Sequence, residues 1–540
     1  MPSRFLRVFL IALALVFASG VAAQADTEEA TQPESIEAAG SHRDESEHVA
    51  ADGLREESGH AAVQNGHAEA GEHTEDHGPP PPIYLVLPFA LLLLMIATGP
   101  LFYAHHWHHN YPKYALGLGV FVSGYYLLAM GTFTPVMHAL VEYISFIALL
   151  ASLFVASGSI LIKTDYAGTP KVNSILLLIG AVIANVIGTT GASMLLIRPY
   201  MRLNKGRIKA YHIIFFIFVV SNVGGALTPI GDPPLFLGFL RGVPFFWTVT
   251  SVWYIWLPTI LVLVGIFAIV DSRNKDESIR EKIEDAGGDP RPGEASDVQP
   301  VQTSSHIVIE GKQGFIWLAI VIASVFLDPN VFAWVPNLTE MFGVPFGIRE
   351  MIMFAVCYLA YRTADKKVLE GNEFNFEPIR EVAWLFIGIF LTMQPALELI
   401  RLFAQENASS LGVTTFYFGT GALSGVLDNA PTYVSFLSAA MGKFGLDVNV
   451  PAMVHQFATG NAESAFYLQA ISVASVFFGA LTYIGNGPNF MVKAIAESSG
   501  VQTPSFVGYV VRYSLPILLP IYVVVWLVFF SGYVMPMPGG

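Results

Sequence analysis

Apolar segments long enough to cross a lipid bilayer follow one another along most of this chain. A transmembrane helix needs about 20 consecutive apolar residues. Segments of this kind, repeated many times, indicate a membrane protein that crosses the bilayer repeatedly. The ten candidate spans cover residues 83–103, 114–131, 142–162, 211–238, 252–270, 314–330, 349–361, 382–400, 465–492 and 513–531.

The composition of the chain supports this interpretation. Only 13% of the residues are charged, 53% are hydrophobic, and the mean hydropathy is +0.54. An average soluble protein carries about 25% charged residues. The chain lacks the basic pattern of a nucleic-acid-binding protein, and a single cysteine, Cys357, excludes an intrachain disulfide or a cysteine-based metal site. We therefore predict an all-α polytopic membrane protein.

The acidity of the chain is concentrated near its N-terminus. Residues 26–78 hold 15 acids and two bases, which accounts for −13 of the formal net charge of −14. Before them, Arg4 and Arg7 precede an apolar stretch, and an A-x-A cleavage signal ends at Ala25. We predict that residues 1–25 form a signal peptide, with an uncleaved anchor as the alternative. The tail that follows has almost no aromatic residues, so we expect it to be disordered and periplasmic. Its six histidines could capture metal ions or belong to a solvated spacer.

Two further apolar segments are predicted to be re-entrant hairpins. Residues 172–197 have lysines and arginines on both flanks, and the positive-inside rule places both flanks in the cytoplasm. We treat residues 413–441 as a second hairpin that opens from the other side. This gives ten crossings of a bacterial inner membrane, with both termini periplasmic. Of the 24 lysines and arginines after residue 78, only four then lie outside, namely Arg241, Arg349, Arg401 and Lys443.

An internal repeat divides the chain into two halves. Residues 225–237 read GALTPIGDPPLFL and residues 479–491 read GALTYIGNGPNFM, which agree at eight of 13 positions. Each half contains three spans, a hairpin, an interrupted span and a last span. Because five crossings are an odd number, the second half enters the membrane inverted. The predicted parts are a first repeat over 79–270, a cytoplasmic linker over 271–312 and a second repeat over 313–540.

The repeated motif cannot continue an α-helix. In the first copy, the prolines that follow Thr228 remove backbone donors and Gly231 relaxes the backbone. Gly485, Gly487 and Pro488 interrupt the helix in the same way around Asn486 in the second copy. Non-helical backbone at membrane depth is tolerated only where it lines a cavity or is buried in protein. Broken spans of this kind bind ions through helix ends and exposed carbonyls. The sequence therefore indicates a transporter.

Two carboxylates lie deep in this apolar sequence, Asp232 in the first broken span and Asp428 at the tip of the second hairpin. A buried carboxylate is costly unless it has a function or a partner. Such a group favours its protonated form, so it could exchange a proton for a metal cation. The alternative is structural: Asp232 would cap the following helix and Asp428 would hydrogen-bond the turn of its hairpin.

At these residues the chain resembles the ion transporter superfamily, and most closely the NhaD-type sodium/proton antiporters and the citrate-transporter-like sodium:proton antiporters. The resemblance covers residues 83–531 and rests on SNVGGALTPIGDPPLFLGF (221–239), SGVLDNAPTY (424–433) and IGNGPNF (484–490). It implies inverted repeats with two hairpins, a homodimer, elevator-like alternating access, and ligands at Asn222, Thr228, Asp232, Asp428 and Asn429. NhaD-type proteins carry an Asp-Asn pair in the first hairpin, whereas this tip reads NVIGTTGAS. A tip of that composition could equally hold an anion through its amides and hydroxyls.

We interpret the chain as a secondary transporter, not an enzyme, that exchanges sodium for protons across the membrane without a cofactor. Asp232 and Asp428 would bind the sodium ion, because hard cations prefer oxygen ligands. The alternative substrate is an organic anion such as citrate, coupled to protons or sodium. A signalling membrane protein with the tail as sensor is the third hypothesis. Neutral ligands are expected from Asn185, Thr189, Thr190, Asn222, Thr228, Asn429, Thr432 and Asn486.

Overall fold

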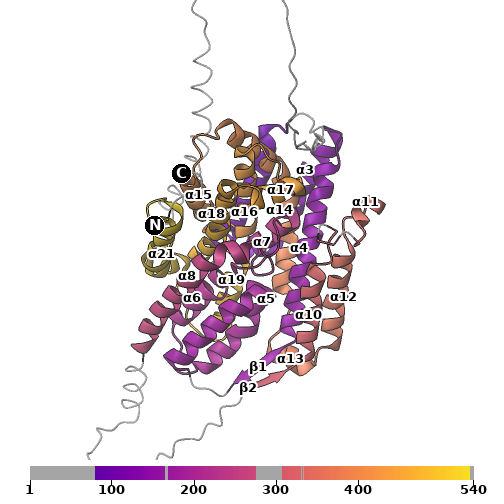
Figure 1. The fold of residues 1–540 in the computed structure, drawn as a ribbon. Helices are drawn as coiled ribbons and strands as arrows, with labels where there is room; N and C mark the ends of the chain where they lie inside the picture. The colour runs from indigo at the N-terminus through magenta and orange to yellow at the C-terminus, as the bar shows by residue number, and fades with distance from the viewer. Residues whose placement is uncertain (1–79, 165–167, 275–306, 330, 333, 536–540) are drawn as a thin grey trace, which may run out of the picture. The chain divides into compact units, whose positions relative to one another are not determined.

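A computed structural model describes residues 80–164, 168–274, 307–329, 331–332 and 334–535 of the chain (Figure 1). Within these residues, six helices are long and apolar enough to cross a bilayer, and three shorter helices are also apolar. The prediction of an all-α polytopic membrane protein is therefore confirmed. The predicted signal peptide and acidic tail lie outside the described residues, as does most of the predicted linker.

Six helices form one packed group, which we call the framework. At its centre, α14 packs against α2, α3, α4 and a helix of the second group, while α4 packs against α10 and α12. The framework helices are α2 (Val86–Phe102), α3 (Ala104–Leu128), α4 (Thr134–Gly158), α10 (Gln313–Val325), α12 (Ile348–Thr363) and α14 (Glu377–Glu406). The one-turn helix η1 (Ile83–Leu85) precedes α2, and the short helices α11 (Leu338–Phe342) and α13 (Lys366–Gly371) lie between the longer ones.

Small and aromatic residues let the framework helices pack closely. A Cβ atom added at Gly388 of α14 would lie 2.7 Å from the carbonyl oxygen of Ala115 in α3, so only glycine fits there. Close backbone approach at small residues is the usual way in which helices associate within a bilayer. Between α4 and α14, the rings of Phe146 and Phe386 stack with their centroids 4.6 Å apart.

The remaining helices form a second group, which we call the site bundle. Its first half contains α5 (Pro170–Leu203), α6 (Ala210–Val219), η2 (Val223–Gly225), α7 (Pro233–Arg241) and α8 (Trp247–Ser272). Its second half contains α15 (Val413–Ser424), α16 (Asn429–Lys443), α17 (Pro451–Thr459), α18 (Ala462–Phe478), η3 (Gly479–Leu481) and α19 (Gly487–Ser498). The last helix runs from 506 to 530 as α20 (Phe506–Tyr509), η4 (Val510–Leu518), α21 (Leu519–Val525) and η5 (Trp526–Phe530).

Both segments predicted to be hairpins fold back on themselves. Helix α5 breaks at Gly188, whose φ of 78° is readily adopted only by glycine. Its two ends then meet, because Asn173 and Asn204 exchange side-chain hydrogen bonds of 2.8 and 2.9 Å. An unbroken helix of 34 residues would hold its ends about 50 Å apart. In the second hairpin, formed by α15 and α16, Lys443 donates a hydrogen bond to the carbonyl oxygen of Ala408, so these ends also lie together.

The two copies of the repeated motif fold alike. In each copy a break precedes a new helix, and the new helices start at equivalent positions, Pro233 and Gly487, although the helix before the break ends at Val219 in the first copy and at Phe478 in the second. The amide of Gly231 donates to Thr228 Oγ1 at 3.1 Å, and the amide of Gly485 donates to Thr482 Oγ1 at the same distance. The repeat found in the sequence is therefore a repeat of backbone conformation from the threonine to the start of the new helix.

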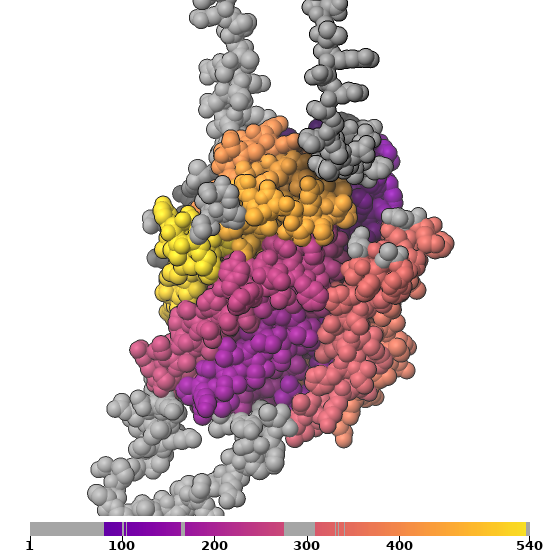
Figure 2. Space-filling model, in the orientation of Figure 1, coloured from indigo at the N-terminus to yellow at the C-terminus, as the bar shows by residue number. Residues whose placement is uncertain are grey.

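A small antiparallel ribbon joins segments that lie far apart in the sequence. Strand β1 (Leu161–Thr164) follows α4 and pairs with β2 (Ile307–Glu310), which precedes α10, at the bottom of Figure 1. Strand β2 falls within the segment that we expected to be linker, and the apolar pattern gave no sign of it. Figure 2 shows the molecular surface in the orientation of Figure 1. Residues of α5 to α8 lie there beside the framework helices α10 and α12.

Candidate functional site

Asp232 occupies the centre of the candidate site. It is the N-cap residue of α7 and only 1% exposed, yet its side chain makes no capping hydrogen bond. Instead its carboxylate accepts hydrogen bonds from three other segments. Thr189 Oγ1 donates to Oδ1 at 2.8 Å from the tip of α5, Asn486 Nδ2 donates to Oδ1 at 3.0 Å, and Asn429 Nδ2 donates to Oδ2 at 2.5 Å. The alternative interpretation of Asp232 was that its side chain caps α7. The hydrogen bonds show that the side chain instead faces the other three segments.

Four helices begin around this carboxylate. Thr189 follows the break in α5, and Asn429 is the first residue of α16. Asp232 and Asn486 are the N-cap residues of α7 and α19, at equivalent positions of the repeated motif. Helix N-termini carry partial positive charge and stabilise a nearby anion. The described residues include no lysine or arginine in an ion pair with Asp232, so neutral donors and helix ends surround the carboxylate.

Three asparagines connect the two broken spans next to Asp232 through hydrogen bonds. Asn222 Nδ2 donates to Asn489 Oδ1 at 2.6 Å, and Asn486 Nδ2 lies 3.2 Å from Asn222 Oδ1. Asn489 in turn donates to the carbonyl oxygens of Gly479 and Thr482. All three asparagines are buried. Backbone carbonyls freed by the breaks are therefore satisfied by side chains of the opposite or the same half, as non-helical backbone in a membrane requires.

A separate set of contacts fixes the first hairpin onto the first break. Asn185 Nδ2 donates to the carbonyl oxygen of Gly224 at 2.6 Å, and Asn185 Oδ1 accepts from the amide of Leu227. Thr228 Oγ1 donates to the carbonyl oxygen of Asn185 at 2.5 Å. The amide of Thr189 also donates to the carbonyl oxygen of Gly231 at 2.8 Å. Asn185 and Thr228 thus hold the backbone in place instead of facing the Asp232 carboxylate.

Asp428 and Thr432 are turned toward their own helix. Asp428 is the N-cap residue of α16, and its Oδ1 accepts a hydrogen bond from the amide of Ala430 at 3.0 Å. Thr432 Oγ1 donates to the carbonyl oxygen of Asp428. These contacts agree with the alternative interpretation of Asp428, in which its side chain hydrogen-bonds the turn of the second hairpin. Asp428 nevertheless precedes Asn429, which donates to the Asp232 carboxylate, so both carboxyl groups belong to the same region.

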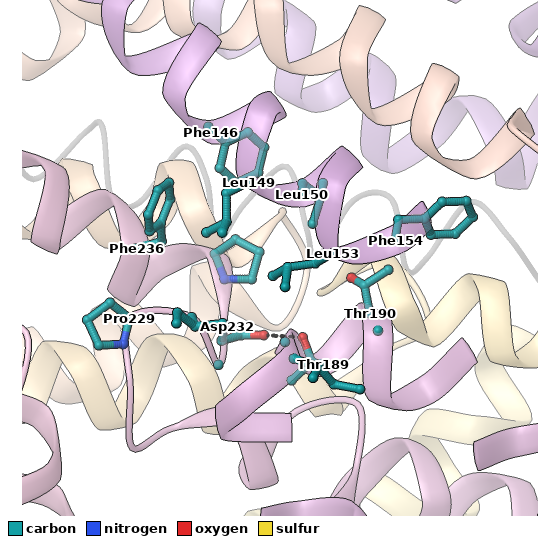
Figure 3. Close-up of a pocket in the computed structure, with 16 residues that line it drawn as sticks. Phe146, Leu149, Leu150, Leu153, Phe154, Thr189, Thr190, Pro229, Asp232 and Phe236 are labelled. Carbon is teal, nitrogen blue, oxygen red and sulfur yellow. Dashed lines mark hydrogen bonds between the residues drawn. The ribbon is translucent and has the colours of Figure 1, made fainter. Parts of the chain in front are cut away.

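A pocket opens beside Asp232, between the site bundle and α4 (Figure 3). One wall is the tip of the first hairpin and the first break, where Thr189, Thr190 and Asp232 lie. The opposite wall is the apolar face of α4, with two phenylalanines and three leucines. The described residues that line the pocket include no lysine, arginine or histidine. The α4 residues in this wall are Phe146, Leu149, Leu150, Leu153 and Phe154.

The structure brings together five of the ten residues singled out from the sequence. Hydrogen bonds link Thr189, Asn222, Asp232, Asn429 and Asn486 into one network. Thr190 lines the pocket, and the other four act as backbone braces or in the α16 cap. Asn489 also belongs to the site, although it was not among the ten residues. Its position as a polar residue inside the second copy of the motif was a signal that could have indicated it. The α4 wall is a further addition, and apolar residues in an apolar span carry no such signal.

Broken helices from the two halves meet at a buried carboxylate beside a pocket, an arrangement typical of secondary membrane transporters. The chain belongs to the family described as "Putative citrate transport", whose model matches residues 80–530. This family places it in the ion transporter superfamily, as the resemblance implied. Among curated proteins no match is found.

Proposed function

We propose that this protein exchanges sodium ions for protons, and that Asp232 binds the two in alternation. The observation that carries the proposal is the position of the Asp232 carboxylate, which is buried and contacts both hairpin tips and the second broken span. A carboxylate withdrawn from water is stable when it binds a proton or a cation. Because both would use the same oxygens, one must leave before the other binds.

The neutral side chains around Asp232 could complete a sodium site. Thr189 Oγ1 can offer a lone pair, and rotation of an asparagine amide presents Oδ1 in place of Nδ2. Asn429 Oδ1 is buried without a hydrogen-bond partner in the described structure, so a cation would give it one. All-oxygen coordination of this kind suits a hard cation. Asp428 contributes negative charge to the same region, and we assign it the supporting role.

The pocket lining favours a cation over a large anion. Recognition of a tricarboxylate normally calls for arginine or lysine side chains. The pocket wall opposite Asp232 consists instead of phenylalanine and leucine side chains of α4. The distribution of basic residues along the sequence supports an orientation in a bacterial inner membrane with α7 ending at the outer surface and the β1–β2 ribbon inside.

Uptake of an organic anion such as citrate is the second candidate, and one observation supports it besides the family description. Four helix N-termini meet at Asp232 and favour a negative charge there. If Asp232 were protonated, a carboxylate of the substrate could use these helix ends. Uptake would then be coupled to the proton on Asp232.

Flux measurements in everted membrane vesicles distinguish the two candidates. A pH gradient is formed, and sodium chloride or choline chloride is added while a fluorescent dye reports the gradient. We expect sodium, but not choline, to dissipate the gradient in the wild type and to have no such effect in Asp232→Asn. Sodium without effect in the wild type, together with accumulation of labelled citrate in right-side-out vesicles, would contradict sodium/proton exchange and support the second candidate.

A further inference from the structure

Arg241, the last residue of α7, is a buried cation that connects the site bundle to the framework. It is 4% exposed, and its Nη2 lies 2.9 Å from Glu142 Oε2 on α4. Its Nη1 donates to Asn449 Oδ1 at 3.1 Å, and Val448 O lies nearby at 3.4 Å. Both of these acceptors belong to the segment between α16 and α17, within the site bundle. The arginine is thus anchored on its own bundle and reaches across to a carboxylate of the framework.

The Arg241–Glu142 pair does not line the pocket beside Asp232 but lies just over one helical turn beyond it along α4 and α7. On α4, Glu142 precedes the pocket residue Phe146 by four positions, which is about one turn of helix. On α7, Arg241 follows the pocket residue Phe236 by five positions. Figure 3 shows Phe146 and Phe236 at the same side of the pocket, away from Thr190. Both helices therefore lead from the pocket wall to the ion pair.

A second ion pair also joins the site bundle to the framework, near the second end of α5. Arg198, on the second arm of α5, lies 3.3 Å from Glu373, which follows α13. The two pairs differ in burial, because the side chain of Glu373 is 67% exposed whereas that of Glu142 is 14% exposed. Ion pairs in water contribute little, while separating a buried pair leaves uncompensated charges and is strongly unfavourable. The Arg241–Glu142 pair is therefore the stronger connection.

We propose that Glu142 and Arg241 form a latch that closes the outer end of the pocket, and that they separate each time Asp232 becomes accessible from that side. This proposal rests on the pocket being the transport site. The two residues lie on groups of helices that must move apart for an ion to pass, and neither contacts Asp232. They act as positioning residues, which control access to the site without binding the ion.

Accessibility of the pocket tests the latch without any measurement of transport. The native cysteine is removed as Cys357→Ala, and Leu150→Cys places one thiol in the pocket wall. A membrane-impermeant maleimide is then added from the outer side. We expect Glu142→Gln in this background to raise the labelling rate on the order of tenfold, because a neutral amide no longer holds the arginine. Equal labelling rates with and without Glu142→Gln would overturn the proposal.

The pair Arg401–Glu398 supplies a matched control. Both partners lie on α14, with a distance of 2.6 Å and side chains that are 15% and 21% exposed, so this contact itself joins no second helix. We expect Glu398→Gln, the same chemical change at a pair within one helix, to leave the labelling rate of Leu150→Cys unchanged. A rise in labelling equal to that of Glu142→Gln would show that loss of any such ion pair loosens the protein, and would refute a specific latch.

Cross-linking provides a second measurement. It holds positions 142 and 241 together without the charges of Glu142 and Arg241. Cysteines replace Glu142 and Arg241 in the Cys357→Ala background, and a bifunctional thiol reagent with a disulfide in its linker joins them. We expect sodium-driven dissipation of the pH gradient to fall at least about tenfold, a change of about 1.4 kcal/mol in activation free energy, and to return after reduction. Cysteines at positions 398 and 401, linked in the same way, should have no effect. Full flux in the cross-linked 142–241 variant would overturn the latch. Absence of flux in the Cys357→Ala protein, which keeps Glu142 and Arg241, would count against the proposed exchange alone.

Discussion

At the scale of single residues, Asp232 is held by donors that carry no charge. Two asparagine amides, one threonine hydroxyl and several helix N-termini stabilise its carboxylate. A lysine or arginine in the same place would neutralise the carboxylate permanently and leave no reason for it to bind a cation. With neutral donors only, the charge stays available. This is why we assign the exchange to Asp232 and not to Asp428, whose carboxylate caps α16.

Asn429→Ala should shift the pH dependence of exchange toward higher pH. Asn429 Nδ2 donates a hydrogen bond to Asp232 Oδ2, and such a bond stabilises the ionised form of a carboxylate. Without it Asp232 retains its proton to a higher pH, and sodium can bind only after that proton has left. The half-maximal pH of sodium-driven dissipation would measure the shift. Ser435→Ala, on the same helix with a bond only to Pro431 O, should leave the profile in place. A shift toward lower pH in Asn429→Ala would contradict this role.

The variant Asp428→Asn should show whether Asp428 binds the transported ion or only caps α16. Asparagine caps a helix about as well as aspartate, so the thermal stability of the protein should be retained, whereas Asp428→Ala should lose about 1 kcal/mol. We expect Asp428→Asn to keep measurable sodium-driven flux, because Asp232 is intact. Loss of flux as complete as in Asp232→Asn would show instead that both carboxylates bind the ion.

At the scale of secondary-structure elements, the breaks matter as much as the helices. Gly188 reverses the direction of α5 so that Thr189 begins a new helix toward Asp232, and the first repeated motif stops α6 so that α7 can begin there. A continuous helix would satisfy these backbone groups internally and present no helix end to the site. The framework helices run without such breaks, and their close packing gives the broken elements a fixed surface.

Gly388→Ala should destabilise the framework. The new Cβ would meet the backbone of Ala115 at 2.7 to 2.8 Å, and backbone atoms can yield only if α3 and α14 move apart. Overpacking of this kind costs about 1–3 kcal/mol. Thermal unfolding in detergent should show a lowered midpoint. Gly117→Ala on α3 is the control, because its Cβ would have no atom within 4 Å. Equal midpoints for the two variants would mean that the α3–α14 contact is less tight than described.

At the scale of the whole molecule, neither half of the chain contains the site by itself. Asp232 and Thr189 come from the first half, while Asn429 and Asn486 come from the second. The contacts of α14 with α3 and α4 cross between the halves in the same way, and the ribbon pairs β1 of the first half with the strand that precedes α10. Assembly of the halves and assembly of the site are therefore one event.

Two separately expressed halves, divided between Asn274 and Ile307, should assemble into an active protein. The contacts between halves are extensive and do not require a covalent connection at this point. We expect a tag on one half to purify the other, and sodium-driven flux to appear only when both are present. Flux from the first half alone would contradict a site shared between the halves. Co-purification without flux would show that the cut itself alters the site.

Much of this protein is determined by its sequence alone. Apolar length and the positions of lysine and arginine indicate a polytopic membrane protein, and glycine and proline in the two repeated motifs determine where helices must break. These properties are local, so a single segment contains the information. Only the tertiary structure decided which carboxylate faces the other half. Asp232 and Asp428 are both N-cap residues within apolar stretches of sequence, and their roles differ because of donors that lie 43 to 254 residues away from Asp232. The same holds for the α4 wall and the Glu142–Arg241 pair, since contacts between distant segments depend on packing that no local pattern specifies.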